Sequence, residues 1–180
     1  MLKIKLLFLL FILFNYLIAC EIGYSKIDDK CYFIEDLDFL EILIKGSQSN
    51  SNSPSENLNP LDLGYQIWGN GRLIEFCSSP KVNTECRTNY TLSGEITKSI
   101  GNLEYLEKMS LESNKFSGNI PSEIKNLKNI IEIKLSSNQL SGKIPDEFGQ
   151  LISLEFLALN SNNLTGKIPS SFKKLINLNW

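Results

Sequence analysis

Apolar residues recur with a fixed period along the second half of the chain. The dipeptide Ile-Pro ends at Pro121, Pro145 and Pro169, so successive copies lie 24 residues apart. Other columns share this period: Leu103, Leu127, Leu151 and Leu175; Met109, Ile133 and Leu157; Leu111, Leu135 and Leu159; Asn114, Asn138 and Asn162; Gly118, Gly142 and Gly166. A period of this length predicts a solenoid in which each repeat buries its apolar edge against its neighbours.

Each repeat contains one short alternating segment. Met109 and Leu111 are apolar, whereas the positions beside them are polar, which predicts a strand with one buried and one solvent-facing side. Stacking these strands gives a parallel sheet on a concave face. The asparagine column should point inward and bond backbone groups that leave the strands, while the glycines and prolines shape the turns and the convex side.

The full pattern, LxxLxxLxLxxNxLSGxIPxxIxxL, occurs as "LEYLEKMSLESNKFSGNIPSEIKNL" and twice more. It resembles the plant-type extracellular leucine-rich repeat, a family that includes receptor-kinase ectodomains and polygalacturonase-inhibiting proteins. The resemblance implies an α/β solenoid: a right-handed superhelix with a parallel β-sheet on the concave face, a short 3₁₀ or irregular convex side, and an N-terminal disulfide cap. About three full repeats, with partial ones at both ends, fill residues 92–180.

Residues 20–91 resemble the N-terminal cap of that family. The segment "DLDFLEILIK" predicts an amphipathic capping helix whose acids Asp36 and Glu41 lie off its apolar face. That face comprises Phe33, Leu37, Leu40 and Ile44. The Ser/Asn-rich residues 46–60 predict a mobile loop. Setting Asn89 against Asn114 places Cys86 at the core position of Leu111.

The first residues predict export. Lys3 and Lys5 precede an apolar run that ends at Ile18, as in a cleaved secretory signal peptide of residues 1–19. The run is too short to span a membrane as a helix. Cys20 also completes a bacterial lipoprotein box, which leaves a lipid anchor at Cys20 as an alternative. We expect a secreted, extracellular or cell-surface protein.

The four cysteines form two local pairs along the chain. In an exported protein we expect disulfides that join Cys20 to Cys31 and Cys77 to Cys86, one of three formal connectivities. Reduced thiols are the alternative. A zinc site is disfavoured because there is no C-x-x-C spacing and no histidine.

N-x-Ser/Thr sites predict a glycoprotein. Asn89 and Asn163 are the acceptors with a permitted middle residue, and each follows a predicted strand. Asn163 should point outward because its neighbour Asn162 belongs to the inward asparagine column.

Composition narrows the chemistry further. Without histidine, the chain cannot form a Ser-His-Asp or Cys-His site. A formal net charge of −2 without a basic run argues against a nucleic-acid partner. We expect no enzyme, no cofactor and no metal. A carboxylate-dependent hydrolase using Glu112 and Glu132 is disfavoured because these acids fall in different columns.

The solvent-facing strand positions predict a binding surface on the concave face. Its candidate contacts are Lys108, Ser110, Glu112, Glu132, Lys134, Ser136, Phe156 and Asn160. An outward aromatic such as Phe156 is a typical contact anchor, although single exposed aromatics are common. The predicted function is a binding module for a protein, peptide or cell-wall glycan. The alternative is a structural or adhesive surface protein in which the solenoid self-associates.

The last residues begin a further repeat. Leu175, Leu178 and Trp180 occupy its first apolar positions, and no C-terminal cap follows. We expect either a fragment of a longer receptor or a short protein whose uncapped C-terminal end is covered by a partner or by dimerisation.

Overall fold

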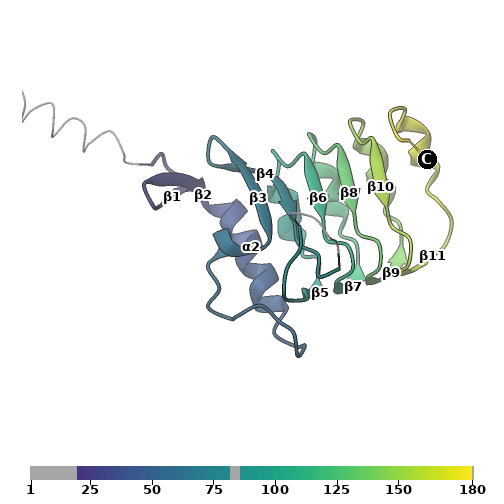
Figure 1. The fold of residues 1–180 in the computed structure, drawn as a ribbon. Coiled ribbons are helices and arrows are strands. Elements are labelled where there is room, and N and C mark those ends of the chain that lie inside the picture. Colours follow the sequence, from purple (N-terminus) through teal and green to yellow (C-terminus); the bar gives the residue numbers. More distant parts are fainter. Residues whose placement is uncertain (1–19, 82–85, 180) are drawn as a thin grey trace, which may run out of the picture.

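Stacked repeats build the molecule from one end to the other. A computed structural model describes residues 20–81 and 86–179, so the predicted signal segment lies outside the described residues. A five-stranded sheet of order β10-β8-β6-β4-β3 forms one side, and a four-stranded sheet of order β11-β9-β7-β5 runs beside it (Figure 1). The strands of the first sheet are β3 (Tyr65–Gly69), β4 (Arg72–Cys77), β6 (Lys108–Ser110), β8 (Glu132–Lys134) and β10 (Phe156–Ala158). Those of the second are β5 (Ser93–Glu95), β7 (Lys115–Asn119), β9 (Gln139–Lys143) and β11 (Asn163–Thr165).

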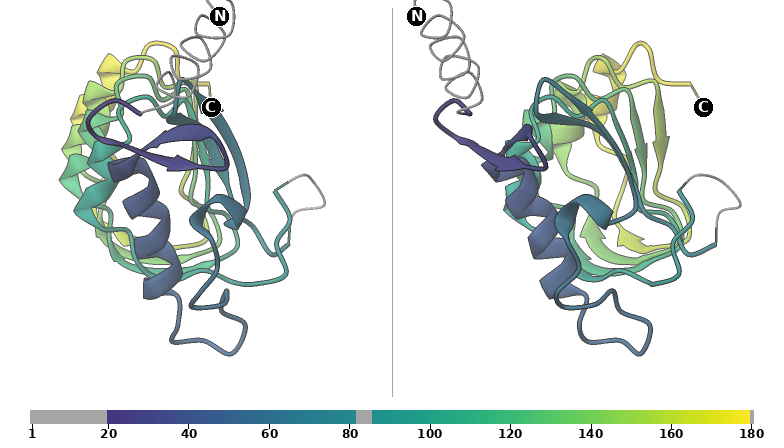
Figure 2. Two further views of the ribbon diagram at one scale, coloured as in Figure 1. Left: turned by 90° about the vertical axis from the view of Figure 1, so that its left-hand side faces the viewer. Right: turned by 60° about the vertical axis from the view of Figure 1, so that its left-hand side comes forward.

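Short 3₁₀ helices stack on the side opposite the first sheet (Figure 2). The proline of each Ile-Pro pair directly precedes a helix, because its fixed φ suits an extended residue at the entrance. These helices are η2 (Lys98–Asn102), η3 (Ser122–Asn126), η4 (Asp146–Gln150) and η5 (Ser170–Lys174). The predicted solenoid, with a parallel sheet and a short 3₁₀ convex side, is confirmed.

The strands pair in the register that the 24-residue period predicts. Lys108 pairs with Glu132 and Glu132 with Phe156, and all the pairings among β4, β6, β8 and β10 are parallel. The intervening Met109 and Ile133 are fully buried. One side of each strand therefore enters the core and the other forms the concave face.

The asparagine column joins each repeat to its neighbours. The side-chain oxygen of Asn138 accepts a hydrogen bond from the Phe116 N–H at 3.0 Å, and its Nδ2 donates to the carbonyls of Leu111 at 2.8 Å and Leu135 at 3.1 Å. Asn114 and Asn162 make equivalent bonds one repeat earlier and later. Each amide thus satisfies backbone groups that no strand partner reaches.

A residue with left-handed backbone directly precedes each asparagine of the column. Ser113, Ser137 and Ser161 have φ between 56° and 59°, so this serine column marks a strained turn. Gly142 has a φ of 74°, and a Cβ there would collide with the side-chain oxygen of Asn119. Gly118 and Gly166 also have positive φ, so the glycine column is required by its left-handed backbone conformation.

The N-terminal cap covers the first repeat with helix α2 (Ile34–Gly46), the hairpin of β1 (Tyr24–Ile27) and β2 (Lys30–Phe33), and η1 (Pro60–Asp62). The buried apolar residues of α2 are Leu37, Phe39, Leu40, Leu43 and Ile44. Two expectations for this helix were wrong. Phe33 ends β2 and does not lie on the helix, and Asp36, expected off the buried face, is completely buried.

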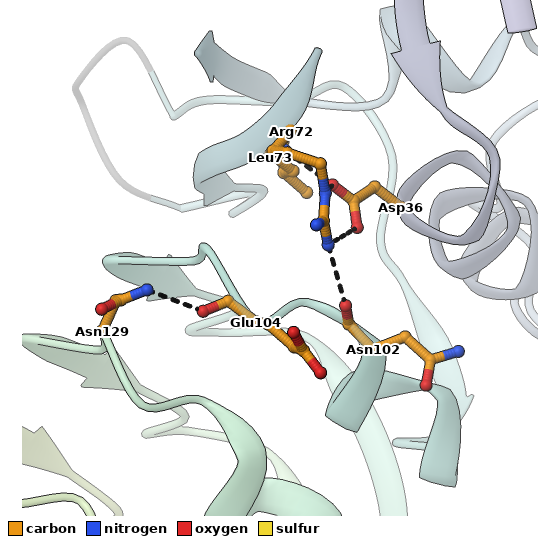
Figure 3. Close-up of polar contacts among 6 residues, drawn as sticks. All are labelled: Asp36, Arg72, Leu73, Asn102, Glu104 and Asn129. Atoms are coloured by element: carbon orange, nitrogen blue, oxygen red, sulfur yellow. Dashed lines mark hydrogen bonds and ion pairs between the residues drawn. The ribbon is translucent and has the colours of Figure 1, made fainter. Parts of the chain in front are cut away.

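Asp36 is buried because Arg72 neutralises it (Figure 3). Arg72 donates to both carboxylate oxygens, at 2.9 and 3.1 Å, and the Leu73 N–H donates a third bond at 2.8 Å. The same guanidinium reaches the Asn102 carbonyl at 3.2 Å. Its guanidinium carbon lies 4.0 Å from the ring centroid of Phe33 and 4.4 Å from that of Tyr105. One side chain therefore joins α2, β4 and η2.

Side chains of the Ser/Asn-rich segment bond it to the start of the repeats. The Ser47 hydroxyl donates to the Leu43 carbonyl at 2.6 Å and accepts from the Ser93 N–H at 3.0 Å. Asn50 donates to the Thr91 carbonyl at 3.1 Å. Hydrogen bonds therefore hold the first part of residues 46–60 against the start of β5. The sequence had predicted a mobile loop here.

The two disulfides join Cys20 to Cys31 and Cys77 to Cys86, the local pairs favoured by the sequence. The expected alignment of Cys86 with Leu111 was wrong, because β4 is the strand beside β6 and places Cys77 opposite Ser110. Among residues 20–81 and 86–179, no helix has both the length and the apolar character to cross a membrane.

Asn138→Ala should lower the free energy of unfolding by about 1–3 kcal/mol, because the buried Phe116 N–H loses its acceptor and the carbonyls of Leu111 and Leu135 each lose one of two amide donors. Chemical denaturation followed by circular dichroism measures this change. Asn129→Ala is the control, since its exposed amide makes a single bond to the Glu104 carbonyl. Equal effects of the two substitutions would contradict the ladder.

Asp36→Asn should destabilise the chain by about 3–5 kcal/mol, because it leaves the Arg72 charge buried without a counterion. Glu41→Gln should change stability by less than about 1 kcal/mol, since the Glu41–Lys45 pair is solvent-exposed. Thermal or urea unfolding compares the two variants. A neutral effect of Asp36→Asn would show that Arg72 does not hold the cap in place.

Candidate functional site

The concave face presents two outward columns that the strand register fixes. One runs through Glu75, Lys108, Glu132 and Phe156. The other runs through Cys77, Ser110, Lys134 and Ala158. The β4 residues of these columns lie before the first 24-residue repeat. For this reason Glu75 was not identified from the sequence.

A hairpin signal in the sequence was available to locate β4. Asn70 and Gly71 have φ of 51° and 75° and connect β3 to β4, which pair antiparallel. An Asn-Gly pair between two strand-like runs is a strong signal for a two-residue hairpin turn. It would have paired the strand that carries Tyr65 with the strand that carries Glu75.

The charges of the concave face pair with one another. Lys108 lies 2.7 Å from Glu75 on the neighbouring strand, and Lys134 lies 2.7 Å from Glu132 on its own strand. The hydrogen bond from Lys108 to Glu75, together with that carboxylate's negative charge, raises the pKa of Lys108. Both ammonium groups are therefore occupied by carboxylates of the sheet.

Glu112 has a different environment. Its carboxylate accepts a hydrogen bond from the Ser136 hydroxyl at 2.8 Å. Ser136 was predicted as a contact residue, but it is only 3% exposed. Its role in the structure is to hold Glu112, which faces the concave side.

Phe156 lies on β10 with 43% of its surface exposed. The Lys134 ammonium lies 5.2 Å from its ring centroid, within the range of a cation–π contact. Asn160 is also exposed and lies beyond the strand, 3.5 Å from the Ser161 hydroxyl. The aromatic ring and its cation form an amphipathic patch on an otherwise polar surface.

A hollow of about 360 Å³ lies between the cap and the first repeats. It gathers five of the eight predicted contact residues: Lys108, Ser110, Glu112, Glu132 and Lys134. Its other lining residues are Tyr65, Glu75, Phe76, Cys77 and Cys86, which sequence reasoning did not include. Phe156 and Asn160 lie outside its lining, so the face offers a hollow at one end and an aromatic patch towards the other.

Within the described residues, no group of three or more His, Cys, Asp or Glu side chains is arranged to hold a metal ion. The cysteines of the hollow are bonded to each other. The lining therefore offers carboxylates, ammonium groups, hydroxyls and apolar surface to a ligand.

Comparisons with known proteins agree with the repeat geometry. The family model described as "Leucine rich repeat" matches residues 104–164. The BIR2 ectodomain from Arabidopsis thaliana is 30% identical, with a TM-score of 0.55 over 78% of this chain and 69% of that chain. The chain belongs to the plant-type leucine-rich-repeat family.

Two further structures resemble this leucine-rich-repeat chain. The ectodomain of the receptor kinase SOBIR1 from Arabidopsis thaliana is 25% identical, with a TM-score of 0.60 over 82% of this chain and 77% of that one. The ectodomain of the receptor kinase GASSHO1/SCHENGEN3 from Arabidopsis thaliana, in complex with CASPARIAN STRIP INTEGRITY FACTOR 2, is 26% identical. Its TM-score is 0.65 over 80% of this chain and 17% of that one. The chain spans only 15% and 20% of the RGFR1 and PEPR1 chains that it also matches. No curated protein sequence gives a significant match.

The two glycan acceptors are exposed. Asn163 begins β11, where it pairs with Ser141 in the second sheet, and Asn89 lies between the cap disulfide and β5. A glycan on Asn163 would be attached to the second sheet, at a residue outside the lining of the hollow.

Expression in a secreting eukaryotic cell should attach glycans to Asn89 and Asn163, because both side chains are accessible. Glycosidase treatment should then increase electrophoretic mobility, and the double substitution Asn89→Gln, Asn163→Gln should abolish that shift. Asn160→Gln, an exposed asparagine outside any acceptor site, is the control. An exported protein that shows no shift would contradict the prediction.

Proposed function

We propose that this leucine-rich-repeat protein is an extracellular recognition module that binds a peptide or a protein segment along its concave face. Residues 1–19 would direct export, residues 20–91 would cap the solenoid, and residues 92–180 would supply repeats. The observation that carries the proposal is the concave sheet itself. It presents polar columns with an exposed aromatic, Phe156, at one end and the hollow at the other.

The geometry suits an extended ligand. Parallel strands lie about 4.8 Å apart, so the outward columns of β4, β6, β8 and β10 form a broad surface with short side chains between charged ones. An aromatic group that is partly exposed and stacked with a cation contributes a large contact area at low entropic cost. Phe156 is accordingly the main anchor in this proposal.

Similar structures support an extracellular binding role. One is the structure of PEPR1–AtPEP1, at 28% identity and a TM-score of 0.62, and another is GASSHO1/SCHENGEN3 in complex with CASPARIAN STRIP INTEGRITY FACTOR 2. The two disulfides are of the kind that persists in an oxidising compartment. Recognition, without chemistry on the ligand, is the activity that we propose.

Phe156→Ala should weaken peptide binding about tenfold or more, as expected for the loss of an aromatic anchor. The probe is a random dodecapeptide display library selected on the exported wild-type chain. Recovered peptides are then titrated against each variant. Ile152→Ala is the matched control, because Ile152 is 63% exposed but lies outside the concave strands.

Peptides that bind the Phe156→Ala and wild-type chains equally would overturn the concave-face assignment. If no peptide is recovered and the chain instead assembles with rising concentration in sedimentation velocity, the structural or adhesive alternative replaces the proposal.

A further inference from the structure

The charges that line the hollow do not balance. Three carboxylates, those of Glu75, Glu112 and Glu132, face two ammonium groups, those of Lys108 and Lys134. Each lysine lies 2.7 Å from one carboxylate, and the remaining acid, Glu112, is bonded to the neutral hydroxyl of Ser136. The hollow thus has one carboxylate without a cationic partner among the described residues.

The place beside Glu112 is open because its neighbours are short or turned away. Ser110 precedes Glu112 by two residues and pairs with Cys77 on one side and Lys134 on the other. Lys134 contacts Glu132 on its own strand and the Phe156 ring on the next strand, which lies further from the cap. A small serine therefore lies at the centre of the hollow, with Glu112 at one end and the Lys108–Glu75 pair at the other.

Apart from Glu75, whose carboxylate is paired with Lys108, the cap side of the hollow is less polar. Tyr65, Phe76 and the Cys77–Cys86 disulfide line it. A group that enters here contacts apolar atoms along its length before it reaches the carboxylate. This order of contacts matches a long basic side chain, which has an aliphatic stem and a charged head.

We propose that the hollow receives one arginine or lysine side chain of the bound peptide, with its head on the Glu112 carboxylate and its stem against the disulfide and Tyr65. The inference rests on the proposed function and adds a specificity to it. Arginine suits the site best, because its planar guanidinium bonds a carboxylate in a bidentate manner. Ser136 positions Glu112 for this contact.

An acidic ligand group fits the same place poorly. It would meet the charge of Glu112, and each ammonium group that it could approach already has a carboxylate partner at 2.7 Å. Like charges brought together in a partly enclosed site are unfavourable. The charge pattern therefore selects against acidic groups as well as for basic ones.

The direct test uses a small probe and does not require the natural ligand. Acetyl-arginine methylamide, titrated into ¹⁵N-labelled wild-type chain, should shift the amide signals of Ser110, Glu112 and Lys134. Acetyl-citrulline methylamide, which is similar in shape but neutral, should shift them far less. Glu112→Gln should weaken arginine binding about fivefold or more, whereas Glu104→Gln, an exposed acid outside the lining, should leave it unchanged.

Ser110→Leu provides a second variant that keeps every charge but fills the hollow, and it should also abolish the shifts. Equal shifts with arginine and citrulline, or an undiminished response in Glu112→Gln, would overturn the inference. The display selection separates the two proposals. Phe156-dependent peptides without enrichment of arginine or lysine would leave the proposed function intact and remove only the basic-side-chain site.

Discussion

The asparagine amide that bridges consecutive repeats is the interaction on which the architecture depends. A strand of three residues cannot bond all the backbone groups of a 24-residue coil, and the chain leaves each strand where regular pairing stops. Asn138 satisfies the Phe116 N–H of the preceding repeat and carbonyls of two repeats at once. Because Asn114 and Asn162 do the same, the register of one repeat fixes the next, and the outward columns of the concave face follow from it.

A stack of this kind needs a cover for its first apolar layer. The cap covers this layer, and one buried ion pair attaches the cap to the repeats. Asp36 on α2 holds Arg72 on β4, and Arg72 also reaches η2, the first 3₁₀ helix of the repeats, through the Asn102 carbonyl. A buried ion pair costs desolvation, so its value lies in orientation as much as in stability. By fixing β4 beside β6, it also fixes the cap side of the hollow, where Glu75 and the Cys77–Cys86 disulfide lie.

The sequence predicts the repeats well because a fixed period constrains many positions at once. The inward Met109 and the outward Lys108, Glu132 and Phe156 are where the alternation places them. The cap has no such period. Asp36 looks like a polar-face residue because its partner, Arg72, is distant in sequence, and amphipathic patterning treats any carboxylate as solvent-facing.

The candidate site likewise combines residues of the repeats, which the period predicts, with residues of the cap, which it does not. Residues within the repeats, such as Ser110 and Lys134, are found from spacing alone. Tyr65 and Glu75 come from the β3–β4 hairpin, which only the Asn70-Gly71 turn signals. Ser136 shows a further limit, because a short side chain at an outward position is covered by the longer Glu112 beside it. Side-chain length, and not strand direction, decides that case.

Amide hydrogen exchange tests the central claim most directly, because three backbone N–H groups have an asparagine side-chain oxygen as their acceptor. The N–H groups of Leu92, Phe116 and Leu140 donate to Asn114, Asn138 and Asn162 at 2.8, 3.0 and 3.0 Å. If these bonds hold the repeats in register, the three amides exchange as slowly as the strand amides of Met109 and Ile133. Exchange at the rate of an unstructured peptide at these three positions, with the strands still protected, would contradict the account.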